Sequence, residues 1–254
     1  MSLTKDFLGD NYEVVRRLSE GGMGIVYLVR HRHLETHRVV KVIREQYAHN
    51  PELQERFLRE ARTAIRLRHP KIAQIFDFSM TDDGSAFIVM EYIEGRTLQQ
   101  LLRDEGPPPL DLALEIGRQV LEALDYLHGQ GYVHRDISPD NLMLTKDFED
   151  RRLVKLIDLG IAKRTGQEAG TQLTGHGMFL GKAKYSAPEA IEGKEVGAAS
   201  DVYSFGAVLY ELLTGLPPFD GQTFSQLLAA QLFKEPRPFS ESDPQGRIPD
   251  ILRR

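Results

Sequence analysis

The residues best suited to chemistry lie in one stretch, YVHRDISPDNLML, which covers residues 132–144. Asp136 and Asn141 stand five positions apart in a short segment between apolar runs, and a second carboxylate, Asp158, ends the next apolar run, VKLID. Two carboxylates and a carboxamide supply hard oxygen ligands and a proton acceptor. This combination suits Mg²⁺ and a phosphate group rather than a soft metal ion.

Two helices are expected to support this stretch. Residues 110–128 repeat apolar side chains on one helical face, and Gly129 and Gly131 end the pattern. Residues 200–213 are apolar nearly all round, which is typical of a helix buried at the centre of a domain. Asp201 lies at the start of that second helix, where it is a candidate for the N-cap.

The N-terminal part of the chain is rich in strand patterns. Residues 12–29 read as two strands joined by a turn that contains Gly21, Gly22 and Gly24. These glycines let the backbone approach a ligand closely, and their N–H groups can face a phosphate. An ordinary hairpin turn is the alternative, and the glycines alone do not decide between the two. Two further strands are expected over residues 72–78 and 86–92.

Lys41 stands among aliphatic residues in the β-rich run RVVKVI, so it either snorkels to solvent or has a buried partner. Residues 52–67 form a helical pattern in which Glu60 falls in the middle of the apolar face. A carboxylate directed toward a core is costly unless it is paired. Lys41 is the natural partner for Glu60, and this favours the paired interpretation over snorkelling.

Composition sets limits on function. The chain has 254 residues, 41% of them hydrophobic and 27% charged, with a net charge of −5, so no general basic surface points to nucleic acid. It contains no Cys, which excludes disulfides, thiolate zinc sites and a Cys nucleophile, and is compatible with a reducing cytoplasm. The longest uncharged apolar run, residues 202–210, is far too short to span a bilayer, and the N-terminus does not resemble a signal peptide.

The motifs taken together resemble the protein kinase family. His134-Arg135-Asp136 with Asn141, followed by Asp158-Leu159-Gly160, is similar to the catalytic loop and magnesium motif of that family. The other matching motifs, in chain order, are the glycine-rich loop over residues 18–26, Lys41, Glu60, the hinge run FIVMEYIEG, Ala187-Pro188-Glu189 and Asp201. One departure is Ser19, which stands where the family usually has its first glycine.

The resemblance covers residues 12–254 and implies an α+β, two-lobed protein-kinase fold that binds ATP between its lobes. A small β-rich N-lobe with one main helix is expected over about residues 12–90, and a hinge over about 91–95. A larger, mostly helical C-lobe is expected over about 96–254, and this lobe looks truncated at its C-terminal end.

The resemblance also implies a role for each site residue. Asp136 would accept or orient the proton of the substrate hydroxyl, the Lys41–Glu60 pair would present Lys41 to the phosphates, and Asn141 and Asp158 would hold Mg²⁺. The residues expected to contact ATP are Leu18, Ser19, Glu20, Gly21, Gly22, Met23, Gly24, Ile25, Val26, Lys41, Glu91, Ile93 and Met143. Asp201 would brace the backbone of the catalytic loop. Arg135 would bind, through its guanidinium group, a phosphate carried by a residue of the activation segment.

Two further departures occur at positions that face each other in the family fold. Ser138 stands where a Lys usually contacts the γ-phosphate, and Lys182 stands where a Thr usually bonds to the catalytic Asp. We expect Lys182 to supply the cation from the activation segment and Ser138 to supply the hydroxyl near Asp136. Two unrelated surface changes are the alternative.

The function implied is that of a serine/threonine protein kinase that uses ATP and Mg²⁺ and is regulated by phosphorylation of its activation segment. A protein is the expected substrate, and dimerisation for autophosphorylation is one partner interaction that the resemblance allows. One alternative is a pseudokinase or scaffold that binds nucleotide without turnover. A small-molecule phosphotransferase is another, but Ala187-Pro188-Glu189 and the long segment before it favour a protein substrate.

Overall fold

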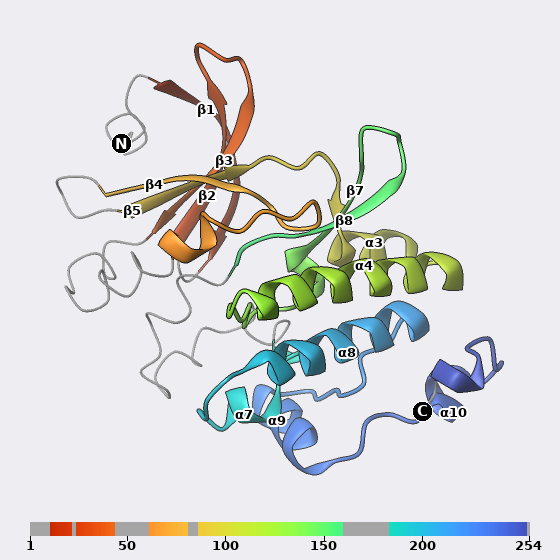
Figure 1. The fold of residues 1–254 in the computed structure, drawn as a ribbon. Coiled ribbons are helices and arrows are strands. Elements are labelled where there is room, and N and C mark those ends of the chain that lie inside the picture. Colours follow the sequence, from red (N-terminus) through yellow and green to blue (C-terminus); the bar gives the residue numbers. More distant parts are fainter. Residues whose placement is uncertain (1–10, 22–23, 44–60, 81–85, 160–182, 253–254) are drawn as a thin grey trace. The chain divides into compact units, whose positions relative to one another are not determined.

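The computed structural model describes residues 11–21, 24–43, 61–80, 86–159 and 183–252. The described residues divide into two compact units, one ending at Glu94 and the other beginning at Gly95 (Figure 1). Five of the residues singled out from the sequence lie outside the described ranges: Gly22, Met23, Glu60, Gly160 and Lys182.

A five-stranded antiparallel sheet dominates the first unit, with strand order β1-β2-β3-β5-β4. Its strands are β1 (Tyr12–Gly21), β2 (Gly24–His31), β3 (His37–Ile43), β4 (Ile75–Met80) and β5 (Ala86–Glu91). The strands are rich in β-branched and aromatic residues, which pack well on a pleated surface. Their inward side chains form a core from Val29, Val40, Phe87 and Val89.

The described end of the predicted 52–67 helix keeps the expected two faces. Residues 61–64 are helical, Ala61, Ala64 and Leu67 are buried, and Arg62 and Arg66 are exposed. Because Glu60 lies outside the described residues, its expected pairing with Lys41 stays a prediction.

Helices make up most of the second unit, together with a small three-stranded sheet of order β6-β7-β8. The helices are α3 (Leu98–Glu105), α4 (Leu110–Gly129), α7 (Pro188–Ile191), α8 (Ala198–Thr214), α9 (Phe224–Phe233) and α10 (Phe239–Ser242). The 3-10 turns are η2 (Pro139–Asn141) and η3 (Asp250–Leu252). The strands are β6 (Arg96–Thr97), β7 (Leu142–Lys146) and β8 (Arg152–Leu156). None of the helices among the described residues is long and apolar enough to cross a membrane.

The two long helices, α4 and α8, lie side by side and form the centre of this unit (Figure 1). The predicted apolar face of α4 is confirmed, since Ala113, Ile116 and Val120 are fully buried. The expectation that α8 is buried all round is wrong at Val202, which is 49% exposed, and at Gly206, one turn further along, which is also exposed.

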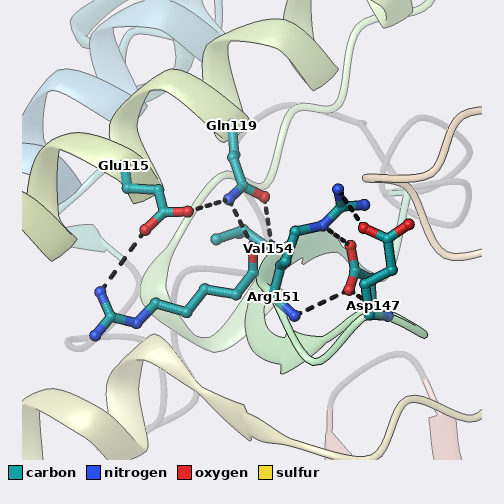
Figure 2. A network of polar contacts seen from close by, with 7 residues as sticks. Glu115, Gln119, Asp147, Arg151 and Val154 are labelled. Atoms are coloured by element: carbon teal, nitrogen blue, oxygen red, sulfur yellow. Dashed lines mark hydrogen bonds and ion pairs between the residues drawn. The ribbon is translucent and has the colours of Figure 1, made fainter.

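Buried Gln119 fastens the β7–β8 hairpin to α4 (Figure 2). Its side-chain oxygen accepts a hydrogen bond from the Val154 N–H at 2.8 Å, and its amide nitrogen donates to the Arg152 C=O at 3.0 Å. Glu115, one turn earlier on α4, also accepts from this nitrogen at 3.3 Å. The Gln119 amide bonds a backbone N–H and a backbone C=O of β8, as a neighbouring strand would. These two bonds fix the position of the hairpin on α4.

Candidate active site

The candidate site begins where α4 ends. Gly131 has φ +70°, and the Tyr132 N–H donates to the Leu127 C=O at 2.9 Å, so the chain turns sharply off the helix into the loop over residues 132–138. This φ lies in the left-handed region, which glycine adopts readily because it has no Cβ atom. Asp136, in the middle of the loop, is 9% exposed, and Asn141, at the end of η2, is 5% exposed.

Asp201 of α8 holds this loop in place through its carboxylate. Its Oδ2 accepts the His134 N–H at 2.7 Å and its Oδ1 accepts the Arg135 N–H at 2.8 Å. The Nε2 atom of His128, near the end of α4, lies 2.9 Å from Oδ2. Asp201 is 1% exposed, and these donors compensate the cost of burying its charge.

The structure therefore favours the bracing role expected for Asp201 from the family resemblance, and the capping role is wrong. Helix α8 begins at Ala198, and its N-cap is Gly197, whose N–H donates to the Ser200 side chain. Asp201 is already inside the helix, so its carboxylate is directed to the loop rather than to the helix end.

Two site residues adopt left-handed backbone conformations. Arg135 has φ +63° and Asp158 has φ +55°, in a region that non-glycine residues visit rarely and at a cost of about 1–3 kcal/mol each. Both positions belong to the expected active site, since Arg135 directly precedes Asp136 and Asp158 is an expected metal ligand. Such conformations persist only where hydrogen bonds from the surrounding structure hold the backbone in place.

His134 supplies part of that restraint. The Asp136 N–H donates to its Nδ1 at 3.3 Å, and its Nε2 lies 3.3 Å from the Ile157 C=O. Complete burial lowers the pKa of His134, although the nearby carboxylates of Asp201, Asp136 and Asp158 act in the opposite direction. A neutral ring with its proton on Nε2 satisfies both bonds and links the loop to the segment that carries Asp158.

Asn141 connects the same two segments. Its side-chain nitrogen donates to the Asp136 C=O at 2.6 Å, and its own C=O accepts the Ile157 N–H at 2.9 Å. The first bond uses the amide nitrogen, and the amide oxygen is the atom that a hard cation prefers. The sequence-predicted set of Asp136, Asn141 and Asp158 is thus brought together by bonds within the second unit.

Asp158 and Asn141 suit a Mg²⁺ ion that takes its other ligands from water and phosphate. They do not suit a metal ion that is coordinated by protein side chains alone. Among the described residues, no group of three or more His, Cys, Asp or Glu side chains is arranged to hold a metal. Mg²⁺ in phosphate sites commonly takes one or two carboxylates and obtains its remaining ligands from water and substrate phosphates. Asp158 with Asn141 matches that partial set.

Ser138 is the least satisfied group in the loop. It is 1% exposed, and its Oγ has no hydrogen-bond partner among the described residues. A buried hydroxyl without a partner is unfavourable by about 1–3 kcal/mol. Because Lys182 lies outside the described residues, the exchange of roles between Ser138 and Lys182 stays a prediction.

The described residues of the expected glycine loop lie on β1 and β2, and Lys41 lies on β3. Ser19 pairs with Val26, and a register irregularity before Ser19 bulges the strand at Leu18. Lys41 lies on β3 and is 8% exposed, which argues against the interpretation that its ammonium snorkels to solvent. The Gly21–Gly24 pairing shows a hairpin, and this is compatible with both interpretations of the glycine turn.

The expected hinge contacts lie at the end of β5, where Glu91 is the last residue of the strand, and just beyond it at Ile93. The Glu91 N–H donates to the Gln74 C=O at 2.8 Å, so this N–H already has a hydrogen-bond partner within the first unit. Ile93 is 8% exposed. Met143 belongs to the second unit, where it lies on β7 and pairs with Thr97 and Lys155.

The segment around Ala187-Pro188-Glu189 is anchored through Tyr185, whose hydroxyl donates to Glu211 of α8. Burial raises the pKa of Glu211, whereas the Tyr185 hydrogen bond and the Lys184 charge lower it. Burial and the Glu211 charge also raise the pKa of Tyr185. Ser200 donates to the Glu189 carboxylate, so this residue too has a partner on α8.

The fold and the braced carboxylate loop define a protein kinase domain. Residues 12–245 match the family model described as the protein kinase domain, and the chain belongs to this family. It is 37% identical over 244 residues to the serine/threonine-protein kinase pkn3 of Myxococcus xanthus, covering 96% of this chain and 45% of the relative. It is also 37% identical to the serine/threonine-protein kinase PknB of Mycobacterium leprae, covering 94% of this chain and 38% of PknB.

A solved structure of the Mycobacterium tuberculosis PknI kinase domain matches with a TM-score of 0.69 at 31% identity, covering 96% of this chain and 86% of that one. The chain spans less than half the length of the curated relatives pkn3 and PknB. The two-lobed kinase fold expected from the sequence is confirmed by these relatives.

Proposed function

We propose that this chain is a serine/threonine protein kinase that transfers the γ-phosphoryl group of Mg-ATP to a Ser or Thr hydroxyl of a protein. The observation that carries the proposal is the bracing of the loop. A buried carboxylate of α8, Asp201, holds the backbone next to Asp136 in a left-handed conformation that costs free energy. A fold maintains such strain where the orientation of a side chain matters.

In this reaction Asp136 accepts or orients the proton of the substrate hydroxyl. The hydroxyl oxygen forms a bond to the γ-phosphorus while the bond between that phosphorus and the β–γ bridging oxygen breaks, and ADP leaves. Asn141 and Asp158 are the residues proposed to hold Mg²⁺, which neutralises phosphate charge when it is bound. Most of the rate enhancement then comes from positioning and charge neutralisation.

The nucleotide contacts proposed are those of the family. Lys41, paired with Glu60, would bind the α- and β-phosphates, and the glycine loop over residues 18–26 would cover them. The carbonyl of Glu91 and the backbone of Ile93 would bond the adenine, with Met143 beneath the ring.

Regulation is proposed to act through the activation segment. Thr171 and Thr174 are the candidate phosphorylation sites, with Arg135 as the receiver, and both threonines lie outside the described residues. Phosphorylation of one copy by another would require transient dimerisation, and its initial rate would rise with the square of the protein concentration. The cytoplasm, where ATP is available, is the compartment that this activity requires.

The test is incubation of the purified chain with Mg-ATP, followed by phosphopeptide mapping of the protein itself and of a peptide array. We expect phosphate on Ser and Thr, and none when Mg²⁺ is chelated. Nucleotide binding without phosphate on any peptide would instead identify a scaffold.

A further inference from the structure

Tyr132 joins the end of α4 to the residue that follows Asp158. Its N–H donates to the Leu127 C=O at 2.9 Å, and its hydroxyl donates to the Leu159 C=O at 2.5 Å. Tyr132 and Leu159 are each 4% exposed, so this hydrogen bond is sheltered from water. A buried tyrosine hydroxyl requires a partner, and here that partner is a backbone group of the candidate site.

The bond acts on a strained part of the chain. Asp158, with φ +55°, is fixed on its N-terminal side by the bonds of Ile157 to His134 and to Asn141. The Tyr132 hydroxyl fixes the chain on the C-terminal side, at Leu159. With both flanking residues held by the 132–141 segment, the backbone of Asp158 has little freedom to leave its left-handed conformation.

We propose that Tyr132 is a positioning residue for Asp158. Its hydroxyl, acting through the Leu159 carbonyl, keeps the Asp158 carboxylate oriented toward the metal and the phosphates. The inference rests on the proposed function, because the metal role of Asp158 is part of it. Phenylalanine would fill the same space, so the contribution of the hydroxyl is the hydrogen bond and not the packing.

The test is Tyr132→Phe, with Tyr210→Phe as the matched control. The Tyr210 hydroxyl donates to the Arg237 C=O at 2.6 Å and lies 2.6 Å from the Ser242 Oγ, away from the site. Both changes remove one hydrogen-bonded hydroxyl, so both should lower the melting temperature by a similar amount. The measurement that separates them is the Mg²⁺ concentration that gives half of the ADP-dependent rise in melting temperature, which needs no turnover.

We expect Tyr132→Phe to raise that Mg²⁺ concentration about tenfold and to lower kcat/KM for Mg-ATP about tenfold, because the loss of one buried hydrogen bond releases Asp158. Tyr210→Phe should change neither by more than twofold. Replacing Tyr132 with 4-aminophenylalanine, which restores a donor at the same place, should recover most of the Mg²⁺ dependence.

The inference is overturned if Tyr132→Phe matches Tyr210→Phe in Mg²⁺ requirement while the wild-type protein phosphorylates a peptide. If the wild-type protein shows neither peptide phosphorylation nor Mg²⁺-dependent stabilisation by ADP, the proposed function fails and the inference fails with it. The two failures are therefore told apart by the wild-type measurement alone.

Discussion

Replacing Asp201 with Asn tests whether the loop depends on the brace from α8. Both carboxylate oxygens of Asp201 accept backbone N–H groups, from His134 and Arg135, in a site that is 1% exposed. Asp201→Asn keeps one acceptor and sets an NH₂ group against the other N–H. A hydrogen bond to a charged group contributes about 1.5–3 kcal/mol, so we expect a loss of about 2–4 kcal/mol in the free energy of unfolding.

For a chain of this size, that loss corresponds to a fall in melting temperature of roughly 5–15 °C, which leaves the protein folded at room temperature. The catalytic effect should be larger than the stability loss implies. With the brace weakened, Arg135 can leave its left-handed conformation and Asp136 moves with it. A displacement of about 1 Å at a reacting group can lower kcat about 10²-fold.

Asp243 provides a control with the same chemistry. It is 3% exposed, its Oδ1 accepts the Arg247 N–H at 3.0 Å, and its Oδ2 accepts the Ile248 N–H at 2.8 Å. Urea unfolding and steady-state phosphorylation should be measured for Asp201→Asn and Asp243→Asn together. Equal stability losses with kcat within twofold of wild type for both variants would refute the view that the brace serves catalysis.

Three further predictions follow from single contacts. Because burial lowers the pKa of His134, its contribution to stability is fully present above pH 6.5 and is lost as pH falls toward its folded-state value. The loss is at most about 1.4 kcal/mol per pH unit, and urea unfolding of His134→Gln should show a flatter dependence between pH 7.5 and 5.5. Gln119→Leu should lower the free energy of unfolding by about 1–3 kcal/mol, since it leaves the buried Val154 N–H and the part-buried Arg152 C=O without their side-chain partner, and a loss under 1 kcal/mol would mean water replaces the amide. Ser138→Lys and Lys182→Thr should each lower phosphorylation activity while the double change recovers much of it, and simple addition of the two losses would make the exchange coincidental.

Local pattern predicted the long elements well. The helix expected over residues 110–128 is α4, Leu110–Gly129, because its apolar period is strong and Gly131 supplies a clear ending. The short helix α3 was not predicted, although its Thr97–Gln100 capping box was a readable signal, because eight residues give too little period. The strand expected from residue 72 begins at Ile75, since Ile72 closes a turn with His69.

The site residues were found by motif, whereas their supports were not. Asp136, Asn141 and Asp158 stand in recognisable spacing, but His128 lies 73 residues from Asp201 and Gln119 lies 35 from Val154. Contacts at such separations depend on how α4 packs, and no local pattern encodes them. Tyr132 carries no signal of a site in the sequence either, because an aromatic residue beside a loop is more often part of the core.

The most direct test of the central claim compares wild-type protein with Asp136→Asn in a time course of peptide phosphorylation, with ATP binding measured on both. We predict that the variant binds ATP within a few-fold of wild type and transfers phosphate roughly 10²–10⁴-fold more slowly, because it lacks the proton acceptor. A variant that phosphorylates the peptide within tenfold of the wild-type rate would contradict the account and remove Asp136 from the mechanism.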